Sequence, residues 1–237
     1  MVIDTNCIIS KEYTVNDLLK EMDKAGIDKA AVSLLPHSEM YEDLVESIRN
    51  NPGRLYGIYD VNPYDRDITG KIIKAFSEGF VGIRLNPLAY GFALDNMELL
   101  SPVLDICQKW KKGVWVYSTA DVFCCPVLLK KAAEKYPDVN FILGFMGFNY
   151  ESNGAITIAQ KYPNVYLDCT CAMYANLSGA ISKTEGKKAV FGSGAGYASF
   201  AEIELNKIRQ LKLPADVEQN VLYGNAVRIF GLQEGSL

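Results

Sequence analysis

Short apolar segments rich in β-branched and aromatic residues alternate along the chain with segments that have the periodicity of amphipathic helices. The alternation occurs eight times, at intervals of roughly 25–30 residues, the usual length of one strand–helix unit. Such units join parallel strands through right-handed crossovers, and eight of them close into a barrel. The pattern therefore predicts an α/β fold, a single (β/α)8 TIM barrel.

The predicted strands cover residues 1–9, 30–35, 55–61, 79–87, 113–118, 139–143, 165–169 and 188–192. A first helix is predicted from Thr14, whose spacing to Asp17 matches a capping box. Further helices are predicted at 38–50, 67–77, 96–111, 122–136, 153–161 and 199–211, with a weaker one after the seventh strand and two short ones ending near Phe230. An unusually long loop follows the fourth strand. A doubly wound open sheet is the alternative, but no phosphate-binding fingerprint follows the first strand.

Composition indicates one soluble domain over residues 1–237, because no linker or compositional shift interrupts the chain. Hydrophobic residues make up 49% and charged residues 22%, enough to form a real core. The net charge of -4 argues against nucleic acid or an anionic membrane as partner. No segment has the ~20 apolar residues of a membrane span, and the N-terminus lacks a secretion signal. We therefore expect a cytoplasmic protein.

Six cysteines occur at positions 7, 107, 124, 125, 169 and 171, without the Cys-x-x-Cys spacing of zinc or redox motifs. In a cytoplasmic protein we expect reduced, mostly buried thiols. Cys124 and Cys125 precede a predicted helix start, where the helix N-terminus lowers the pKa of a thiol. One of them is a candidate nucleophile, although a structural role is commoner for such cysteines.

Seven short motifs follow one another along the chain, at residues 4–8, 79–87, 113–117, 136–147, 162–168, 191–194 and 224–231. In this order they resemble the amidohydrolase-related family, in the branch of metal-dependent hydrolases that includes aminocarboxymuconate-semialdehyde decarboxylase. The resemblance implies a TIM barrel with its chemistry at the C-terminal ends of the strands.

The same resemblance places the family's usual metal-ligand positions on Asn6, Ile8, Tyr117, Phe145 and Gly194. Zinc or manganese requires several converging imidazole, thiolate or carboxylate ligands. Three of these five side chains have no lone pair, and the chain contains a single histidine, His37. We therefore expect no bound metal and no other cofactor.

Two charged residues remain as candidates at the barrel mouth. His37 follows the second strand, and histidine is the side chain most often used as a general acid or base, but a solvent-exposed loop histidine fits equally. Arg84 shares a strand face with Asn86, and if that face points inward the cation needs an anionic partner. That partner is either a substrate carboxylate, which the resemblance favours, or one of the structural candidates Asp4, Asp60 and Asp168.

The loops that follow the strands are rich in aromatic residues, which offer apolar area and, in tyrosine, a polar tip. This pattern predicts an aromatic-lined pocket, although loop packing or an oligomer contact is the alternative. A glycine-rich run at 192–196 follows the eighth strand. It suggests either that backbone N–H groups bind a phosphate there or that the small residues merely fill the available space. The predicted pocket residues are Asp4, Asn6, Asn86, Tyr90, Tyr117, Phe145, Tyr150, Tyr174, Ser193, Gly194 and Tyr197.

Three functional hypotheses follow. The first is a metal-free enzyme that holds a small organic acid or amide through Arg84 and tyrosines, with His37, Asp168 or Asp121 moving protons. The second is a catalytically inactive binding or scaffold barrel. The third is a metal-dependent hydrolase or decarboxylase with a site rebuilt from groups such as Asp4, Asp168 and a cysteine. The loop aromatics also make a homodimer plausible.

Overall fold

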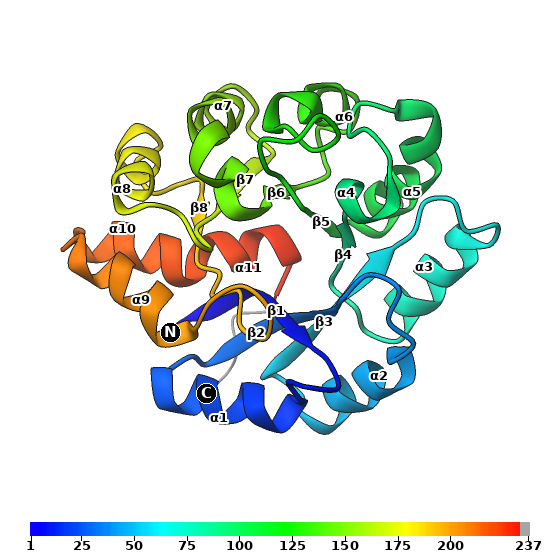
Figure 1. Ribbon diagram of the computed structural model, residues 1–237, viewed down its shortest axis with the longest axis horizontal. Helices are drawn as coiled ribbons and strands as arrows, with labels where there is room; N and C mark the ends of the chain where they lie inside the picture. Colours follow the sequence, from blue (N-terminus) through cyan, green and yellow to red (C-terminus); the bar gives the residue numbers. More distant parts are fainter. Residues whose placement is uncertain (233–237) are drawn as a thin grey trace.

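The computed structural model describes residues 1–232, and in it eight parallel strands pair in the order in which they follow along the chain. Backbone hydrogen bonds between the first strand and the segment after the eighth, from Thr5 to Phe191 over 2.9 Å and from Gly194 to Asn6 over 2.9 Å, close the sheet. Figure 1 shows the strands at the centre of a ring of helices. The strands are β1 Ile3–Ile9, β2 Lys29–Leu34, β3 Leu55–Val61, β4 Gly82–Leu85, β5 Gly113–Val116, β6 Phe141–Leu143, β7 Val165–Asp168 and β8 Ala189–Val190. The predicted TIM barrel is confirmed.

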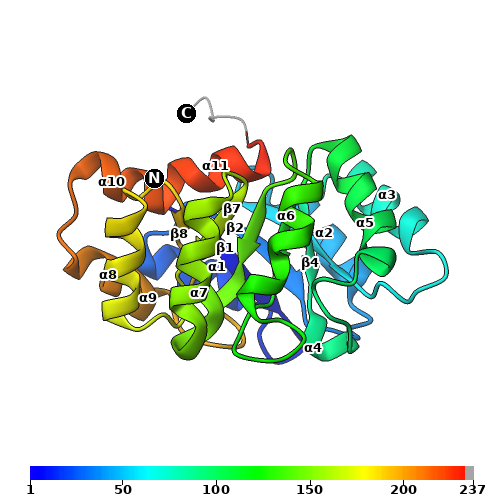
Figure 2. The same ribbon diagram turned by 90° about the horizontal axis from the view of Figure 1, so that it is seen from above.

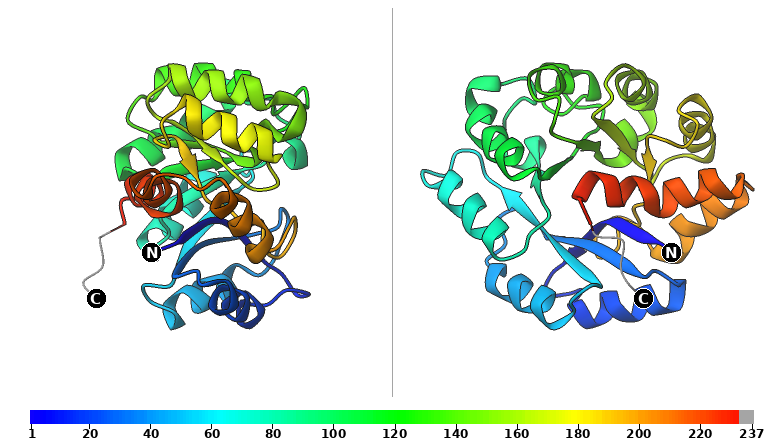
Figure 3. Two further views of the ribbon diagram at one scale, coloured as in Figure 1. Left: turned by 90° about the vertical axis from the view of Figure 1, so that its left-hand side faces the viewer. Right: turned by 180° about the vertical axis from the view of Figure 1, so that it is seen from behind.

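The helices surround the barrel and connect successive strands (Figure 3). They are α1 Val15–Ala25, α2 Tyr41–Asn50, α3 Ile68–Ser77, α4 Pro87–Tyr90, α5 Met97–Trp110, α6 Lys130–Lys135, α7 Phe148–Lys161, α8 Tyr174–Lys183, α9 Ala201–Gln210, α10 Ala215–Gln219 and α11 Asn225–Phe230. Single helical turns occur at Pro126–Leu129, Gly144–Gly147 and Asn220–Gly224. No helix within residues 1–232 combines the length and apolar character needed to cross a membrane.

Helix α1 forms where the sequence predicts it. The Thr14 hydroxyl accepts from the backbone of Asp17, and the Asp17 carboxylate accepts from the backbone of Thr14, a capping box that satisfies two free N–H groups. Gly26 ends the helix with a φ of 75°. Leu18 and Met22 are buried on the inner face, and each contributes about 1.5–3 kcal/mol by leaving water.

Two segments differ from the prediction. The loop after β4 contains α4, because the Asn86 side chain caps its N-terminus, Pro87 begins it and Gly91 ends it at a φ of 70°. The single helix expected at 122–136 is wrong in its first part: residues 117–125 form a loop, and only the turn at Pro126 and α6 are helical. The proline begins that turn because its missing N–H needs no partner there.

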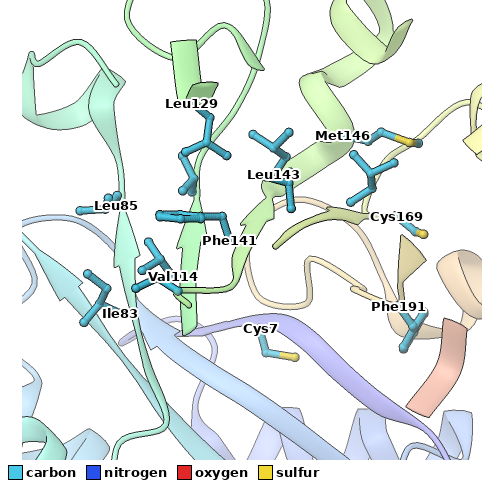
Figure 4. Close-up of a cluster of buried hydrophobic side chains, with 14 of the residues drawn as sticks. Cys7, Ile83, Leu85, Val114, Leu129, Phe141, Leu143, Met146, Cys169 and Phe191 are labelled. Carbon is cyan, nitrogen blue, oxygen red and sulfur yellow. The ribbon is translucent and has the colours of Figure 1, made fainter. Parts of the chain in front are cut away.

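The apolar core has two layers. One lies between the strands and the surrounding helices, and Figure 4 shows part of it, with Leu85, Val114, Phe141 and Leu143 drawn. The other fills the barrel interior, where Ile58 and Ile142 belong to one buried cluster with Ile229 and Phe230 of α11. Because the N-terminal ends of the strands face α11, that end of the barrel is closed, and α4 lies at the opposite end (Figure 2). The C-terminal ends of the strands are therefore left for the site.

Candidate functional site

Asn6 of β1 is the centre of a buried hydrogen-bond network at the C-terminal half of the barrel. Its Nδ2 donates to Oδ2 of Asp168 over 3.0 Å and to the Thr170 hydroxyl over 3.0 Å. Its Oδ1 accepts from Nη1 of Arg84 over 3.1 Å and from the Tyr197 hydroxyl over 2.7 Å. An amide has both a donor and an acceptor end, so Asn6 links a buried anion to a buried cation.

Arg84 projects from β4 into this network and is only 3% exposed. Its guanidinium carbon lies 3.9 Å from the ring centre of Trp115 and 5.2 Å from that of Tyr197. Nη2 donates to the Tyr197 hydroxyl over 3.1 Å, and Nε is buried without a partner. Within residues 1–232, no carboxylate forms an ion pair with Arg84. The ion pairs with Asp4, Asp60 or Asp168 that the sequence suggested are therefore absent from this part of the chain. Stacking on the rings contributes about 1–2 kcal/mol, and Asp60, the register partner of Arg84 on β3, acts on the guanidinium electrostatically without forming an ion-pair contact.

Asp168, the last residue of β7, is fully buried and accepts four hydrogen bonds. Oδ1 accepts from the backbone and hydroxyl of Thr170, over 3.1 and 2.8 Å. Oδ2 accepts from Asn6 and from the backbone of Phe145 over 3.1 Å. Burial raises the pKa of Asp168 to about 6, although these bonds act in the opposite direction. With every lone pair engaged, the carboxylate holds the site together and has no free position for proton transfer.

Asp4 lies on β1 beside this network. Its Oδ1 accepts from the backbone of Asn6 over 3.0 Å and from the backbone of Ser193 over 2.9 Å. Its Oδ2 is buried without a partner, and burial raises the pKa of the carboxyl to about 6. The Ser193 hydroxyl in turn accepts from the backbone of Ala195 over 2.9 Å. Through these hydrogen bonds, the buried side chains of Asp4 and Ser193 stabilise the turn after β8.

Phe145 covers the network with an aromatic cluster that consists of Trp115, Tyr117, Phe145 and Tyr197. The Phe145 ring lies 5.3 to 6.0 Å from the other three rings, each in an edge-on arrangement. Residues 145–148 all have a positive φ, between 49° and 73°. This backbone costs roughly 1–3 kcal/mol at each non-glycine residue, and such strain persists where the surroundings fix it, often at functional sites.

The residues at the family's metal-ligand positions do not fit a divalent cation. Asn6 Oδ1 already accepts two hydrogen bonds, one of them from a cationic guanidinium that repels a metal. Phe145 contributes a ring, and Ile8 and Gly194 have no donor side chain. Among residues 1–232 no group of three or more His, Cys, Asp or Glu side chains is arranged to hold a metal ion.

His37 lies apart from Arg84, on the wall of a cavity of about 470 Å³ between α2 and α3. It is exposed, has a φ of 64°, and its ring packs edge-on against Tyr90 at 4.8 Å. The Tyr90 hydroxyl donates to Asp60 over 2.5 Å and accepts from the His37 backbone over 3.2 Å. His37 and Tyr90 thus share a cavity with Asp60, and neither is hydrogen-bonded to the network around Asn6.

The other predicted site residues are dispersed. Tyr150 is 85% exposed, and Tyr174 is 51% exposed with its hydroxyl donating to the backbone of Gln210. Asp121 accepts from the backbone of Phe123 in the loop after β5. Gly194 has a φ of 69° in the turn after β8.

The six cysteines are all free. The thiols of Cys124 and Cys125 have a raised pKa because of burial, the reverse of the lowering expected at a helix N-terminus.

Sequence reasoning missed three residues of the network. Trp115 of β5 stacks on Arg84, and its spacing of two from Tyr117, just after the strand, is the available signal. Thr170 has the same spacing from Asp168. Gly192 is required because a Cβ there would lie 2.0 Å from Oδ1 of Asp168, a contact that only the folded structure reveals.

Comparison with known proteins places this chain in a family. The profile of a family described as amidohydrolase matches residues 2–232. No curated protein matches the chain. An uncharacterized TIM-barrel protein from Bordetella bronchiseptica has a TM-score of 0.81 at 15% identity, over 97% of this chain and 98% of that one. 5-Carboxyvanillate decarboxylase from Sphingomonas paucimobilis has a TM-score of 0.75 at 16% identity, over 98% and 99%.

A dihydroxybenzoic acid decarboxylase from Polaromonas, solved with manganese and the inhibitor 2-nitroresorcinol, has a TM-score of 0.77 at 14% identity, over 99% of this chain and 98% of that one. At these identities the structural matches establish the fold alone. The family follows from the profile, which extends from β1 through α11 and confirms the resemblance found in the sequence motifs. The chain belongs to the amidohydrolase family.

Proposed function

We propose that this barrel binds a small aromatic carboxylate at Arg84 and does so without a divalent cation. The observation that carries the proposal is the state of Arg84: a buried guanidinium whose two hydrogen bonds go to neutral oxygens and whose Nε has no acceptor. An arginine in this state binds a carboxylate strongly, because the planar group matches two carboxylate oxygens at once.

The free edge of the guanidinium defines how the ligand binds. Nε and Nη2 form one side of the planar group, and only the Tyr197 hydroxyl accepts from that side. A carboxylate that bonds both nitrogens replaces this hydroxyl. Tyr197 is half-buried and follows Gly194 and Gly196, whose positive φ values of 69° and 86° mark a turn built on glycine.

The surroundings favour an aromatic ligand. Trp115, Tyr117 and Phe145 lie beside Arg84 and offer ring faces and edges for a flat apolar body. Two similar structures, 5-carboxyvanillate decarboxylase and dihydroxybenzoic acid decarboxylase, are named for aromatic carboxylates. The carboxylate would neutralise the charge that the protein leaves unpaired.

Binding without turnover fits the network better than catalysis. All four lone pairs of Asp168 are engaged, and His37 is outside the hydrogen-bonded cluster at Asn6. A general acid or base must be within hydrogen-bond reach of the proton it moves. We therefore favour the hypothesis of a catalytically inactive binding barrel.

A thermal-shift screen tests this proposal on protein treated with a chelator. Benzoate and its hydroxylated derivatives should raise Tm, by roughly 5–10 °C at a hundredfold excess over Kd. The matched benzamides, which lack the negative charge, should leave Tm unchanged. Equal stabilisation by amides and acids, or stabilisation only after zinc or manganese is added, would overturn the proposal.

A further inference from the structure

A cavity separate from the network around Arg84 lies between α2 and α3. Its volume is about 470 Å³, within the range of roughly 300–1,000 Å³ in which pockets bury most of a drug-sized molecule. The ends of β2 and β3, both helices and Tyr90 of α4 contribute to its wall. None of Asn6, Arg84, Asp168 and Tyr197 lines it. The cavity is therefore a second candidate binding site with a chemistry of its own.

One side of this cavity is apolar and belongs to the core between the strands and the helices. Leu34 at the end of β2, Leu44 of α2 and Ile68 of α3 line the cavity and are buried in that core. The rings of Tyr41 and Tyr59 pack against the same core, line the cavity and meet edge-on at 5.7 Å. All five side chains thus face the cavity from one layer of the protein, outside the barrel interior. Such a wall favours a flat aromatic ligand.

Tyr59 provides a hydrogen-bonding group on this apolar side. Its hydroxyl forms no hydrogen bond with residues 1–232, and it is not one of the unpartnered polar atoms that the fold seals from solvent there, so a ligand can reach it. Burial, with a smaller contribution from the Asp65 carboxylate on the same cavity wall, raises the pKa of Tyr59 to about 12. The hydroxyl therefore stays protonated at neutral pH and can donate to an oxygen of the ligand.

The lysines and aspartates that line the cavity leave no free charge for a ligand. Lys71 pairs with Asp65, and Lys74 pairs over 3.0 Å with an exposed glutamate of α2. Oδ2 of Asp60 accepts from the Tyr90 hydroxyl, and Oδ1 of Asp60 is buried, so this carboxylate offers a ligand no accessible oxygen. A charged ligand would lose its hydration without gaining an opposite charge. The wall therefore suits a neutral ligand.

We propose that this cavity binds a neutral aromatic ketone with two rings, whose carbonyl oxygen accepts from the Tyr59 hydroxyl. Its rings lie against the apolar wall of Leu34, Leu44 and Ile68. One ring fills only part of the volume, so benzamide remains a valid neutral control for Arg84. The inference is independent of carboxylate binding at Arg84, because no hydrogen-bonding group of that network lines the cavity.

Titration calorimetry with benzophenone tests the ligand class, with protein added to the sparingly soluble ligand. Diphenylmethane has the same two rings without the carbonyl oxygen, and 4-(aminomethyl)benzophenone adds a positive charge. Benzophenone should bind roughly fivefold more tightly than diphenylmethane, the effect of one hydrogen bond, and at least as tightly as the amine. Equal affinity for benzophenone and diphenylmethane would show that the cavity selects only apolar bulk, and tighter binding of the amine would show that it selects a cation. Either result would refute the proposal.

Tyr59→Phe tests the hydrogen bond, because it removes the hydroxyl and keeps the ring that packs against Tyr41. The variant should bind benzophenone roughly fivefold more weakly and diphenylmethane as the parent does. Tyr56→Phe is the matched control on the same strand: it lies outside the cavity, and its hydroxyl donates only over 3.5 Å to the backbone of Gly53. Benzophenone affinity that is the same in Tyr59→Phe and Tyr56→Phe would contradict the assignment.

Photolabelling locates the ligand. Irradiated benzophenone inserts into nearby C–H bonds, so peptide mapping by mass spectrometry should find the label within residues 34–44 and 59–74, which form most of the wall. An excess of benzoate should leave this labelling unchanged, and Tyr59→Phe should keep its affinity for benzoate. Failure at this cavity is thereby distinguished from failure at Arg84. Label found only outside these two segments, or label that benzoate displaces, would count against the cavity as the site.

Discussion

Nη1 of Arg84 donates to Oδ1 of Asn6 over 3.1 Å in the centre of the barrel, at a position where the family resemblance places a metal ligand. The guanidinium supplies a positive charge there, and the other end of the Asn6 amide binds Asp168. A fixed organic cation and a fixed anion are thus separated by one neutral side chain. In our proposal, this arrangement lets the barrel hold an anionic ligand with protein groups alone.

Replacing Asn6 with alanine should destabilise the protein by roughly 2–4 kcal/mol. The change leaves the guanidinium, the Tyr197 hydroxyl and one lone pair of Asp168 without their partner, and unsatisfied buried groups are costly. Urea unfolding of both proteins measures the difference. Asn16→Ala, at an exposed position of α1, is the control and should change stability by less than about 0.5 kcal/mol.

Asp4→Asn should make stability less dependent on pH. Burial raises the pKa of Asp4 from 3.8 to about 6, so its contribution to folding is fully present below pH 3.8 and is lost as the pH rises through 6. Asparagine stays neutral and keeps an oxygen for the two backbone donors. The variant should therefore gain stability relative to the parent, up to about 3 kcal/mol above pH 7.

Urea unfolding at pH 4 and pH 8 checks the Asp4 prediction. The difference between variant and parent should be small at pH 4 and large at pH 8. Asp138→Asn, at an exposed position, should give the same small difference at both values. A difference for Asp4→Asn that does not change with pH would mean that the buried carboxyl is not the titrating group.

Gly192→Ala should destabilise the protein by about 1–3 kcal/mol, because the new Cβ would lie 2.0 Å from Oδ1 of Asp168 and 2.6 Å from the Thr170 hydroxyl. Gly179→Ala in α8 is the matched substitution, since its Cβ would meet no atom within 4 Å. That control should gain about 0.5–1 kcal/mol from helix propensity. Thermal unfolding of the two variants should therefore shift in opposite directions.

Tyr197→Phe separates stability from ligand binding. Loss of the hydroxyl removes its bonds to Asn6 and Arg84 and should lower stability by about 1 kcal/mol. It also removes the group that a carboxylate must replace at Nη2, so benzoate affinity should be kept or increased. Calorimetry and urea unfolding of the same sample measure both effects. A loss of affinity would assign the hydroxyl to the ligand contacts instead.

The fold could be predicted from the sequence because its evidence is local and repeated. Each strand–helix unit has its own periodicity, and the Thr14 capping box fixes the start of α1. Helix α4 also had local evidence, in the order Asn86, Pro87 and Gly91, but four residues are too few for a periodic pattern. The start of α6 was missed because apolar residues continue through the loop before Pro126.

The site was harder to predict because its contacts join distant strands. The sequence placed Arg84 on one strand face with Asn86 but left open whether that face points inward. The bond from Arg84 to Asn6 depends on how β1 and β4 face each other across the barrel. The cavity lined by Asp60 depends on how α2 and α3 are placed relative to each other in the folded barrel. The positive φ values of residues 145–148 arise from tertiary contacts of Phe145, and no residue type there other than Gly147 indicates them.

The most direct test of the account is a calorimetric titration of chelator-treated protein with benzoate, before and after the change Arg84→Gln. The parent should bind one benzoate per chain, with an affinity that added zinc or manganese does not raise, and Arg84→Gln should bind at least tenfold more weakly. Arg54→Gln, which removes an exposed arginine paired with Asp23, should bind as the parent does. Benzoate binding that requires added metal, or that survives unchanged in Arg84→Gln, would contradict the claim that Arg84 binds the carboxylate without a metal ion.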